Sequence, residues 1–192
     1  MKVVSFWNPK GGQGKTPLAL NVAAAAVEIG LSVILIDRDL QGSAIIYKES
    51  GNLPYDVLSE IPEEAPDVDL VILDHMATDY EIPPAKIVVI PFIPERDHYN
   101  KFMFNKNKVI AAGGNKNIIS VVTNGDLRNK NDRDLVYEVK KRGVYEVKRS
   151  GVFKEAAAHY TTIFDKMFDK YYSIDLTRSQ ISSILTAILK ES

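Results

Sequence analysis

The chain has 192 residues, 45% of them hydrophobic and 26% charged, a balance that is ordinary for a globular protein. The absence of cysteine excludes a disulfide framework, a thiolate zinc site and a cysteine-ligated iron–sulfur cluster. No apolar run reaches the roughly 18 residues that a membrane span needs, and the first residues do not form a signal peptide, so we expect a cytoplasmic protein. The length suits one domain that covers residues 1–192.

The formal net charge is −1, but the two halves of the chain differ in sign. Residues 1–96 carry 7 Lys and Arg against 14 Asp and Glu, whereas residues 97–192 carry 17 against 11. A basic half is typical of a protein that binds a polyanion. The same counts also fit a surface of solvated charges, so composition alone leaves both interpretations open.

Apolar runs rich in β-branched residues alternate with helical patterns along the chain. Buried strands are predicted at residues 3–7, 33–36, 70–73, 87–90 and 118–122. An Ala-rich segment, residues 18–29, predicts a helix that ends at Gly30. Since strands that alternate with helices form right-handed βαβ units, we predict a three-layer α/β fold with a mostly parallel central sheet flanked by helices.

Residues 136–143 and 144–151 are nearly identical octads. We predict that the first octad ends a helix that begins near Asp132 and stops at Gly143, and that the second forms a strand and its exit loop. From Ser179 onwards, apolar residues recur on one helical face with few basic residues opposite. This pattern favours a helix that packs on the domain over the alternative, a helix lying on a membrane surface.

The strongest motif lies between the first predicted strand and the first predicted helix, and it reads Asn8-Pro9-Lys10-Gly11-Gly12-Gln13-Gly14-Lys15-Thr16. Its glycines let backbone N–H groups turn towards phosphate oxygens, and the following helix adds its positive N-terminal end. Lys15 would supply a charge for the β- and γ-phosphates, and the Thr16 hydroxyl would ligate Mg²⁺. The motif predicts a P-loop NTPase fold that binds ATP and Mg²⁺, with nucleotide contacts from Gly11, Gly12, Gln13, Gly14, Lys15 and Thr16.

Residues 10–16 resemble the deviant Walker A motif of the ParA/MinD family of ATPases, and the Asn8-Pro9 that precedes them resembles the short ParA-type DNA partition members. The similarity covers about residues 1–170. In that family the extra lysine, here Lys10, reaches across a dimer interface to the ATP of the partner chain, where a cation stabilises charge on the transferring phosphoryl group. The resemblance thus implies catalytic roles for Lys10 and Lys15 and an ATP-dependent homodimer.

Residues 37–43 resemble the family's Asp-x-Asp-Pro-Gln switch segment, with Leu40 where proline is usual. The resemblance implies that Asp39 helps to position the attacking water and that Asp37 lies near Mg²⁺. Carboxylates at the carboxyl end of a parallel strand also lie where such sheets bind ligands. The alternative is that the two carboxylates only cap the next helix.

Residues 68–74 resemble the family's Walker B strand, which implies that Asp74 contacts Mg²⁺ through water. His75 follows it, and we interpret this histidine as a structural residue. Residues 121–124 resemble the segment whose asparagine hydrogen-bonds adenine, so Asn124 is the predicted base contact.

Pro17 departs from the family, which has a threonine or serine here whose hydroxyl contacts the α-phosphate. Proline is tolerated in the first turn of a helix, but it removes both this hydroxyl and an N–H. We therefore expect Pro17 to line the nucleotide site and to weaken nucleotide binding.

The resemblance and the charge together predict a DNA partition ATPase. Residues 97–154 contain 13 Lys and Arg but only 6 Asp and Glu, and this excess of positive charge suits nonspecific, salt-sensitive DNA binding at the nucleoid. No helix-turn-helix domain precedes the first predicted strand, and a ParB-like centromere-binding protein is the expected partner that stimulates slow hydrolysis. The alternatives are a MinD-like membrane-associated regulator, although we expect no stable membrane association, and a P-loop kinase or ligase that acts on a small molecule.

Overall fold

The computed structural model describes residues 1–39 and 42–191. In chain order the elements are β1 (Lys2–Phe6), α1 (Lys15–Glu28), β2 (Val33–Asp37), α2 (Ser43–Ser50), β3 (Asp56–Leu58), β4 (Leu70–Asp74), β5 (Ile87–Phe92), α3 (Arg96–Ala111), β6 (Asn117–Gly125), α4 (Lys130–Lys140), β7 (Tyr145–Lys148), α5 (Gly151–Ala158), the short 3₁₀ helix η1 (Lys166–Phe168) and α6 (Ile174–Lys190).

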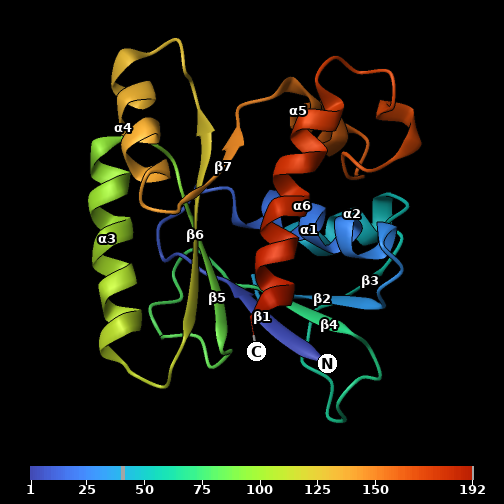
Figure 1. Cartoon of the computed structure of the whole chain (residues 1–192). Coiled ribbons are helices and arrows are strands. Elements are labelled where there is room, and N and C mark those ends of the chain that lie inside the picture. The colour runs from blue at the N-terminus through green and yellow to red at the C-terminus, as the bar shows by residue number, and fades with distance from the viewer. Residues whose placement is uncertain (40–41, 192) are drawn as a thin grey trace.

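The strands form one sheet in the order β3-β2-β4-β1-β5-β6-β7, and every pair in it is parallel. β1 therefore lies in the middle, between β4 and β5 (Figure 1). The register pairs Phe6 with Asp74 and Asp74 with Asp37, so three neighbouring strands end at the same level. Ligands bind at this carboxyl edge in open parallel sheets.

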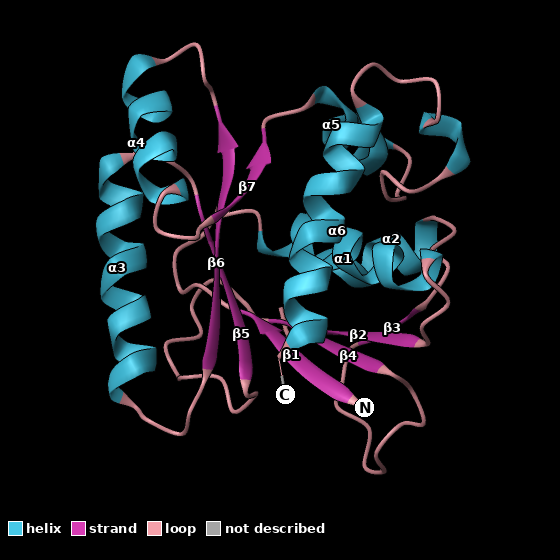
Figure 2. Cartoon of the chain, viewed as in Figure 1, coloured by secondary structure: helices cyan, strands magenta, loops and turns pink. Residues whose placement is uncertain are grey.

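Helices cover both faces of the sheet (Figure 2). On one face, α1 and α6 pack over the sheet in the larger apolar core, to which Leu20 and Ile184 belong. On the other face, α3 and α4 enclose a second core around Trp7, Phe92 and Phe102, in which the Phe92 and Phe102 rings stack with centroids 4.1 Å apart. The three predicted layers are confirmed, and the sheet is parallel throughout the described residues.

The predicted strands are confirmed with small differences at their ends, and the two octads adopt the two predicted structures. α4 begins two residues before Asp132, and Gly143 turns the chain with a φ of 80° before β7. β3 was not predicted from the sequence, because three residues at the edge of a sheet make too short an apolar run.

The C-terminal helix packs on the domain, as its apolar face predicts. It begins at Ile174, five residues before the predicted start, and its residues Ile181, Ile184 and Ile188 are fully buried against the core that includes α1. No helix in the described part of the chain is long and apolar enough to span a bilayer.

We predict that Ile184→Ala lowers the free energy of unfolding by about 2–5 kcal/mol, because it removes a fully buried side chain and leaves a cavity. Leu176→Ala in the same helix is the matched control, since this leucine is 50% exposed, and it should cost about 0.5 kcal/mol or less. Urea unfolding followed by circular dichroism measures both. A loss for Ile184→Ala as small as that expected for Leu176→Ala would mean that the packing of α6 contributes little to stability.

Candidate functional site

The loop between β1 and α1 has the shape that phosphate binding requires. Gly12 and Gly14 have φ angles of 74° and 80°, a left-handed conformation that side chains other than glycine rarely adopt. α1 begins at Lys15, directly after Gly14, so the first backbone N–H groups of the helix have no partner within it. The arrangement therefore presents donors and a positive helix end to an anion.

Asn8 anchors the start of this loop. It is fully buried; its Nδ2 donates to the carbonyl of Pro91 at 2.8 Å, and its Oδ1 accepts from the N–H of Lys10 at 3.0 Å. The side chain of Asn105, on α3, donates to the same oxygen at 3.2 Å. The loop is thereby tied to β5 and to α3.

Gln13 anchors the middle of the loop, and its side chain is buried instead of lying in the site. Its Oε1 accepts from the N–H of Ile93 at 3.3 Å, and its Nε2 donates to the carbonyl of Gly11 at 2.8 Å and contacts Nδ1 of His98 at 2.7 Å. Its own carbonyl accepts from the Thr123 hydroxyl at 3.0 Å. Only the backbone of Gln13 is left to contact a nucleotide.

Lys15, Thr16 and Asp74 gather at the end of the loop. Burial lowers the pKa of the Lys15 amine, while the carboxylates of Asp74 and Asp39 act in the opposite direction. Asp74 is 1% exposed, and neither of its carboxylate oxygens has a hydrogen bond to the described residues. Burial raises the pKa of Asp74 to about 7, although the nearby Thr16 hydroxyl lowers it. A buried carboxyl without partners is costly and suits a site for a cation.

The residues around Asp74 fit Mg²⁺. The two buried carboxylate oxygens of Asp74, which have no hydrogen bond within the described part of the chain, and the Thr16 hydroxyl are the hard oxygen ligands that this ion prefers. Among residues 1–39 and 42–191, no three histidine or acidic side chains converge as a complete metal cage. The remaining ligands of an ion here would therefore be water and the phosphates of a nucleotide.

Asp37 has a capping role in this structure. It is 3% exposed, and its Oδ2 accepts from the N–H groups of Ala44 and Ile45 at 2.7 and 3.1 Å, at the start of α2. Its Oδ1 accepts from the N–H of Asp39 at 3.0 Å. Asp37 therefore caps α2, which is the alternative role considered from the sequence. Its position near Mg²⁺ stays a prediction. Leu40 lies, with the residue after it, outside the described residues.

His75 is a structural residue, as we interpreted it from the sequence. It is 1% exposed, its Nδ1 lies 2.7 Å from a carboxylate oxygen of Asp79, and its Nε2 lies 3.0 Å from the Ser5 hydroxyl. Burial lowers its pKa, and the hydrogen bond to Asp79 opposes this effect. Both ring nitrogens are thus engaged within the protein.

A cavity of about 230 Å³ opens beside the loop. Its lining residues are Gly12, Gly14, Pro17, Leu18, Thr123, Asn124, Val147, Lys148, Arg149, Ser150 and Phe153. The cavity thus joins the phosphate loop to Asn124, the predicted base contact, and to Pro17. Its lining is largely apolar, which suits the flat faces of a base.

Lys10 lies apart from this cavity. Its Nζ is 3.8 Å from a carboxylate oxygen of Asp97 at the start of α3, and its side chain is 33% exposed. Asp97 also pairs with Lys101 at 3.1 Å. A long ion pair at the surface holds Lys10 only weakly.

The CobQ/CobB/MinD/ParA nucleotide-binding domain family matches residues 4–188. The chain belongs to this family. Soj of Bacillus subtilis is 29% identical over 100 residues, a match that covers 48% of this chain and 40% of Soj. This chain therefore covers well under half of that curated relative.

Two solved structures share the fold over nearly their whole length. A plasmid partition protein of Borrelia burgdorferi bound to AMPPNP has a TM-score of 0.68 at 15% identity, covering 98% of both chains. The septum site-determining protein MinD of Pyrococcus horikoshii, complexed with Mg-ADP, has a TM-score of 0.72 at 12% identity, covering 98% of this chain and 97% of that one. At these identities the likeness shows the fold alone.

The structure brings the predicted residues together in two groups. One group contains Lys15 and Thr16 together with the carboxylates of Asp37, Asp39 and Asp74. The other group lines the cavity and consists of Gly12, Gly14, Pro17 and Asn124. The anchoring roles of Asn8 and His98 and the places of Val147 and Phe153 in the cavity wall were not predicted from the sequence. Their parts in the site depend on contacts between segments that are distant in sequence, so no local motif indicated them.

We predict that Pro17→Thr tightens ATP binding by about 10- to 100-fold, because it restores an N–H and a hydroxyl beside the phosphates. Pro17→Ala is the matched control, since it restores only the N–H and should give a smaller gain. Isothermal titration calorimetry with Mg-ATP measures the dissociation constants. An unchanged constant for Pro17→Thr would show that Pro17 does not weaken the site.

Proposed function

We propose that this protein is an ATPase that forms a dimer around two ATP molecules, binds DNA nonspecifically and drives the partitioning of a plasmid or chromosome. A ParB-like partner stimulates its slow hydrolysis. Two observations together carry the nucleotide part: the left-handed backbone of Gly12 and Gly14, and the buried Asp74, whose carboxylate oxygens have no hydrogen bond to the described residues. Family membership and the AMPPNP and Mg-ADP complexes of the two structural relatives support it.

In the proposed site Thr16 would bind Mg²⁺ and Asp74 would contact the ion through water, while Lys15 would bind the β- and γ-phosphates. When bound, the ion neutralises charge on the phosphates. Asp39 orients the attacking water, and Asn124 recognises adenine in the cavity. The lowered pKa of Lys15 fits this role, because a phosphate would restore the favourable surroundings of its charge.

Lys10 supports the proposed dimer. Its ion pair with Asp97 is long and partly exposed, so it costs little to break. Lys10 is therefore available to reach the nucleotide of a second chain, as the lysine of the deviant Walker A motif does in the family. There it adds positive charge beside the transferring phosphoryl group.

A basic groove beside α4 is the proposed DNA contact. It is lined by Leu127, Arg133, Val136, Tyr137, Lys140, Lys141, Glu146 and Lys148. Lys140 pairs with Glu146 at 2.5 Å, whereas Arg133, Lys141 and Lys148 form no ion pair within the described part of the chain. These three cations are thus available to phosphates, and Tyr137, 66% exposed, lies beneath Lys141 with its ring centroid 4.2 Å from Nζ.

Several basic residues outside the groove contribute less than their number suggests. Arg142 pairs with Glu138 at 2.7 Å, and both Arg128 and Arg149 approach Asp126, at 2.6 and 3.6 Å. Cations that already have a carboxylate partner add little net attraction for DNA. The proposed DNA binding therefore depends more on the groove than on the basic half of the chain as a whole.

The packing of α6 argues against the membrane-associated alternative. Its apolar face, with Ile181, Ile184 and Ile188, is buried in the domain. Arg178 on its polar side donates to the carbonyls of Ile163 and Asp165 and pairs with Asp169. An interfacial helix needs a free apolar face and free basic residues. The apolar face of α6 is not free in this conformation, and of its two basic residues Arg178 is already bound within the domain.

We predict that the protein pellets with plasmid DNA in Mg-ATP but not in Mg-ADP. Lys10→Ala should abolish the pelleting in Mg-ATP, because it blocks dimerisation. Lys101→Ala is the control, because it removes a neighbouring lysine of α3. Anionic liposomes and high salt complete the assay. Pelleting with liposomes alone would favour the membrane regulator, and binding to neither would direct attention to small-molecule substrates.

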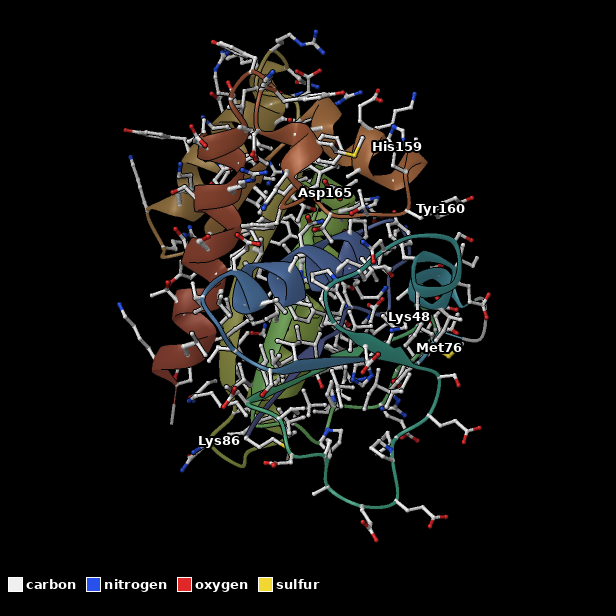
Figure 3. The ribbon with its side chains drawn as sticks, turned by 90° about the vertical axis from the view of Figure 1, so that its right-hand side faces the viewer. Lys48, Met76, Lys86, His159, Tyr160 and Asp165 are labelled. Carbon is white, nitrogen blue, oxygen red and sulfur yellow. The ribbon has the colours of Figure 1, made fainter. Side chains whose placement is uncertain are left out.

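We predict that Lys141→Ala weakens DNA binding at least threefold and reduces the salt dependence by about one ion. Lys86→Ala is the matched control. Lys86 is exposed and is labelled far from His159 and Tyr160 in Figure 3. It directly precedes β5, which begins at the end of the sheet away from α4 and β7, whose residues line the groove (Figure 1). Fluorescence anisotropy with a labelled duplex across a salt series measures both. Equal effects of the two substitutions would show that DNA does not use the groove.

A further inference from the structure

The first turn of α3 contacts the phosphate-binding loop through a histidine that the proposed reaction does not use. His98 is mostly buried, with a side chain 16% exposed, and its Nδ1 lies 2.7 Å from Nε2 of Gln13. Gln13 lies between Gly12 and Gly14, the two residues of the loop with left-handed backbone. One hydrogen bond therefore connects His98 to the centre of the loop.

The orientation of the Gln13 amide follows from its other two contacts. The N–H of Ile93 donates at 3.3 Å, so the atom opposite it is the amide oxygen. The carbonyl of Gly11 accepts a hydrogen bond at 2.8 Å, so the Gln13 atom that contacts it is the amide nitrogen. Turning the amide over would place two donors together at Ile93 and two acceptors together at Gly11, and both contacts would become repulsive.

The tautomer of His98 follows in turn. The amide nitrogen of Gln13 carries only donors, so the Nδ1 that it contacts must be an acceptor without a proton. The ring is then neutral with its proton on Nε2, which faces the Glu95 carboxylate at 3.8 Å. A protonated ring would direct Nδ1–H at the NH₂ group of Gln13 and break the contact.

We propose that His98 is a positioning residue: its neutral ring holds Gln13 and keeps the loop in its phosphate-binding shape, and protonation of the ring releases Gln13 and weakens nucleotide binding. This inference rests on the proposed function, since it assigns the loop to a nucleotide. Among side chains, histidine is the one whose charge ordinarily changes between about pH 5 and 8.

The charged groups around His98 act against the Gln13 contact. A carboxylate oxygen of Glu95 lies 3.8 Å from Nε2 of His98. Asp97 lies on the same turn; its pKa is lowered chiefly by its hydrogen bond to Lys101, and also by Lys10 and His98. A protonated ring would therefore lose its contact with Gln13 and keep the Glu95 carboxylate as a partner on its own helix.

The test is a titration of the full chain with a fluorescent ADP analogue at about pH 8 and about pH 5.5, in EDTA so that protonation of Asp74 cannot act through Mg²⁺. The variants are wild type, His98→Asn, whose amide oxygen can accept as Nδ1 does but does not titrate, and His98→Phe, which has no acceptor. Protonation of the analogue itself affects all three alike.

We expect the wild-type affinity to fall about three- to tenfold more than that of His98→Asn on acidification, which is the effect of one hydrogen bond. His98→Phe should bind weakly at both pH values. Parallel pH profiles for wild type and His98→Asn would overturn the proposal.

Long-range ¹H–¹⁵N NMR of the imidazole at pH 8 gives an answer that needs no nucleotide. A proton on Nε2 is expected, and a proton on Nδ1 would overturn the proposal. If no variant binds the analogue while the Nε2–H tautomer is found, the assignment of the loop to a nucleotide has failed and the contact between His98 and Gln13 stands.

Discussion

The site depends on a loop whose shape the chain cannot hold by local preference. Gly12 and Gly14 both adopt left-handed backbone, and glycine loses more conformational freedom on folding than any other residue. The loop is ordered instead by two buried side chains, those of Asn8 and Gln13, and by the Thr123 hydroxyl, which reach β5, β6 and α3. The shape of the anion site is thus a consequence of how the sheet and α3 pack.

A second constraint is electrostatic. Lys15 and Asp74 are both buried, and burial alone disfavours both charges: it lowers the pKa of the amine and raises that of the carboxyl to about 7. Each partly compensates the other, but the Asp74 oxygens make no hydrogen bond within the described residues. Such a pair is poorly satisfied by the protein alone, and a phosphate beside the amine with a cation beside the carboxyl would satisfy both.

The parts of the molecule that follow local rules could be predicted from the sequence. The buried strands, the glycine-rich turn and the stop at Gly143 each depend on neighbours in the chain, and the structure has them where expected. The rest depends on pairs that the sequence does not mark. Gln13 and His98 are 85 positions apart and Thr123 lies 110 from Gln13, so no spacing indicates that these residues meet. Asp37 illustrates another limit, because one sequence pattern fits both a metal site and a helix cap, and only the contacts distinguish them.

β7 connects the two surfaces on which the proposed function depends. Lys148 at its end lines the cavity beside the loop and also the basic groove beside α4. Its N–H donates to Gln180 of α6 at 3.1 Å, and Val147 next to it is buried in the core that α1 and α6 share. Because β7 has a partner strand on one side only, this packing replaces the second neighbour that a central strand has. Part of α4 has nearly the same sequence as β7, so tertiary contacts decide which secondary structure each octad adopts. The octad whose valines pack against the sheet is helical, and the octad that pairs with β6 is the strand that connects the two surfaces.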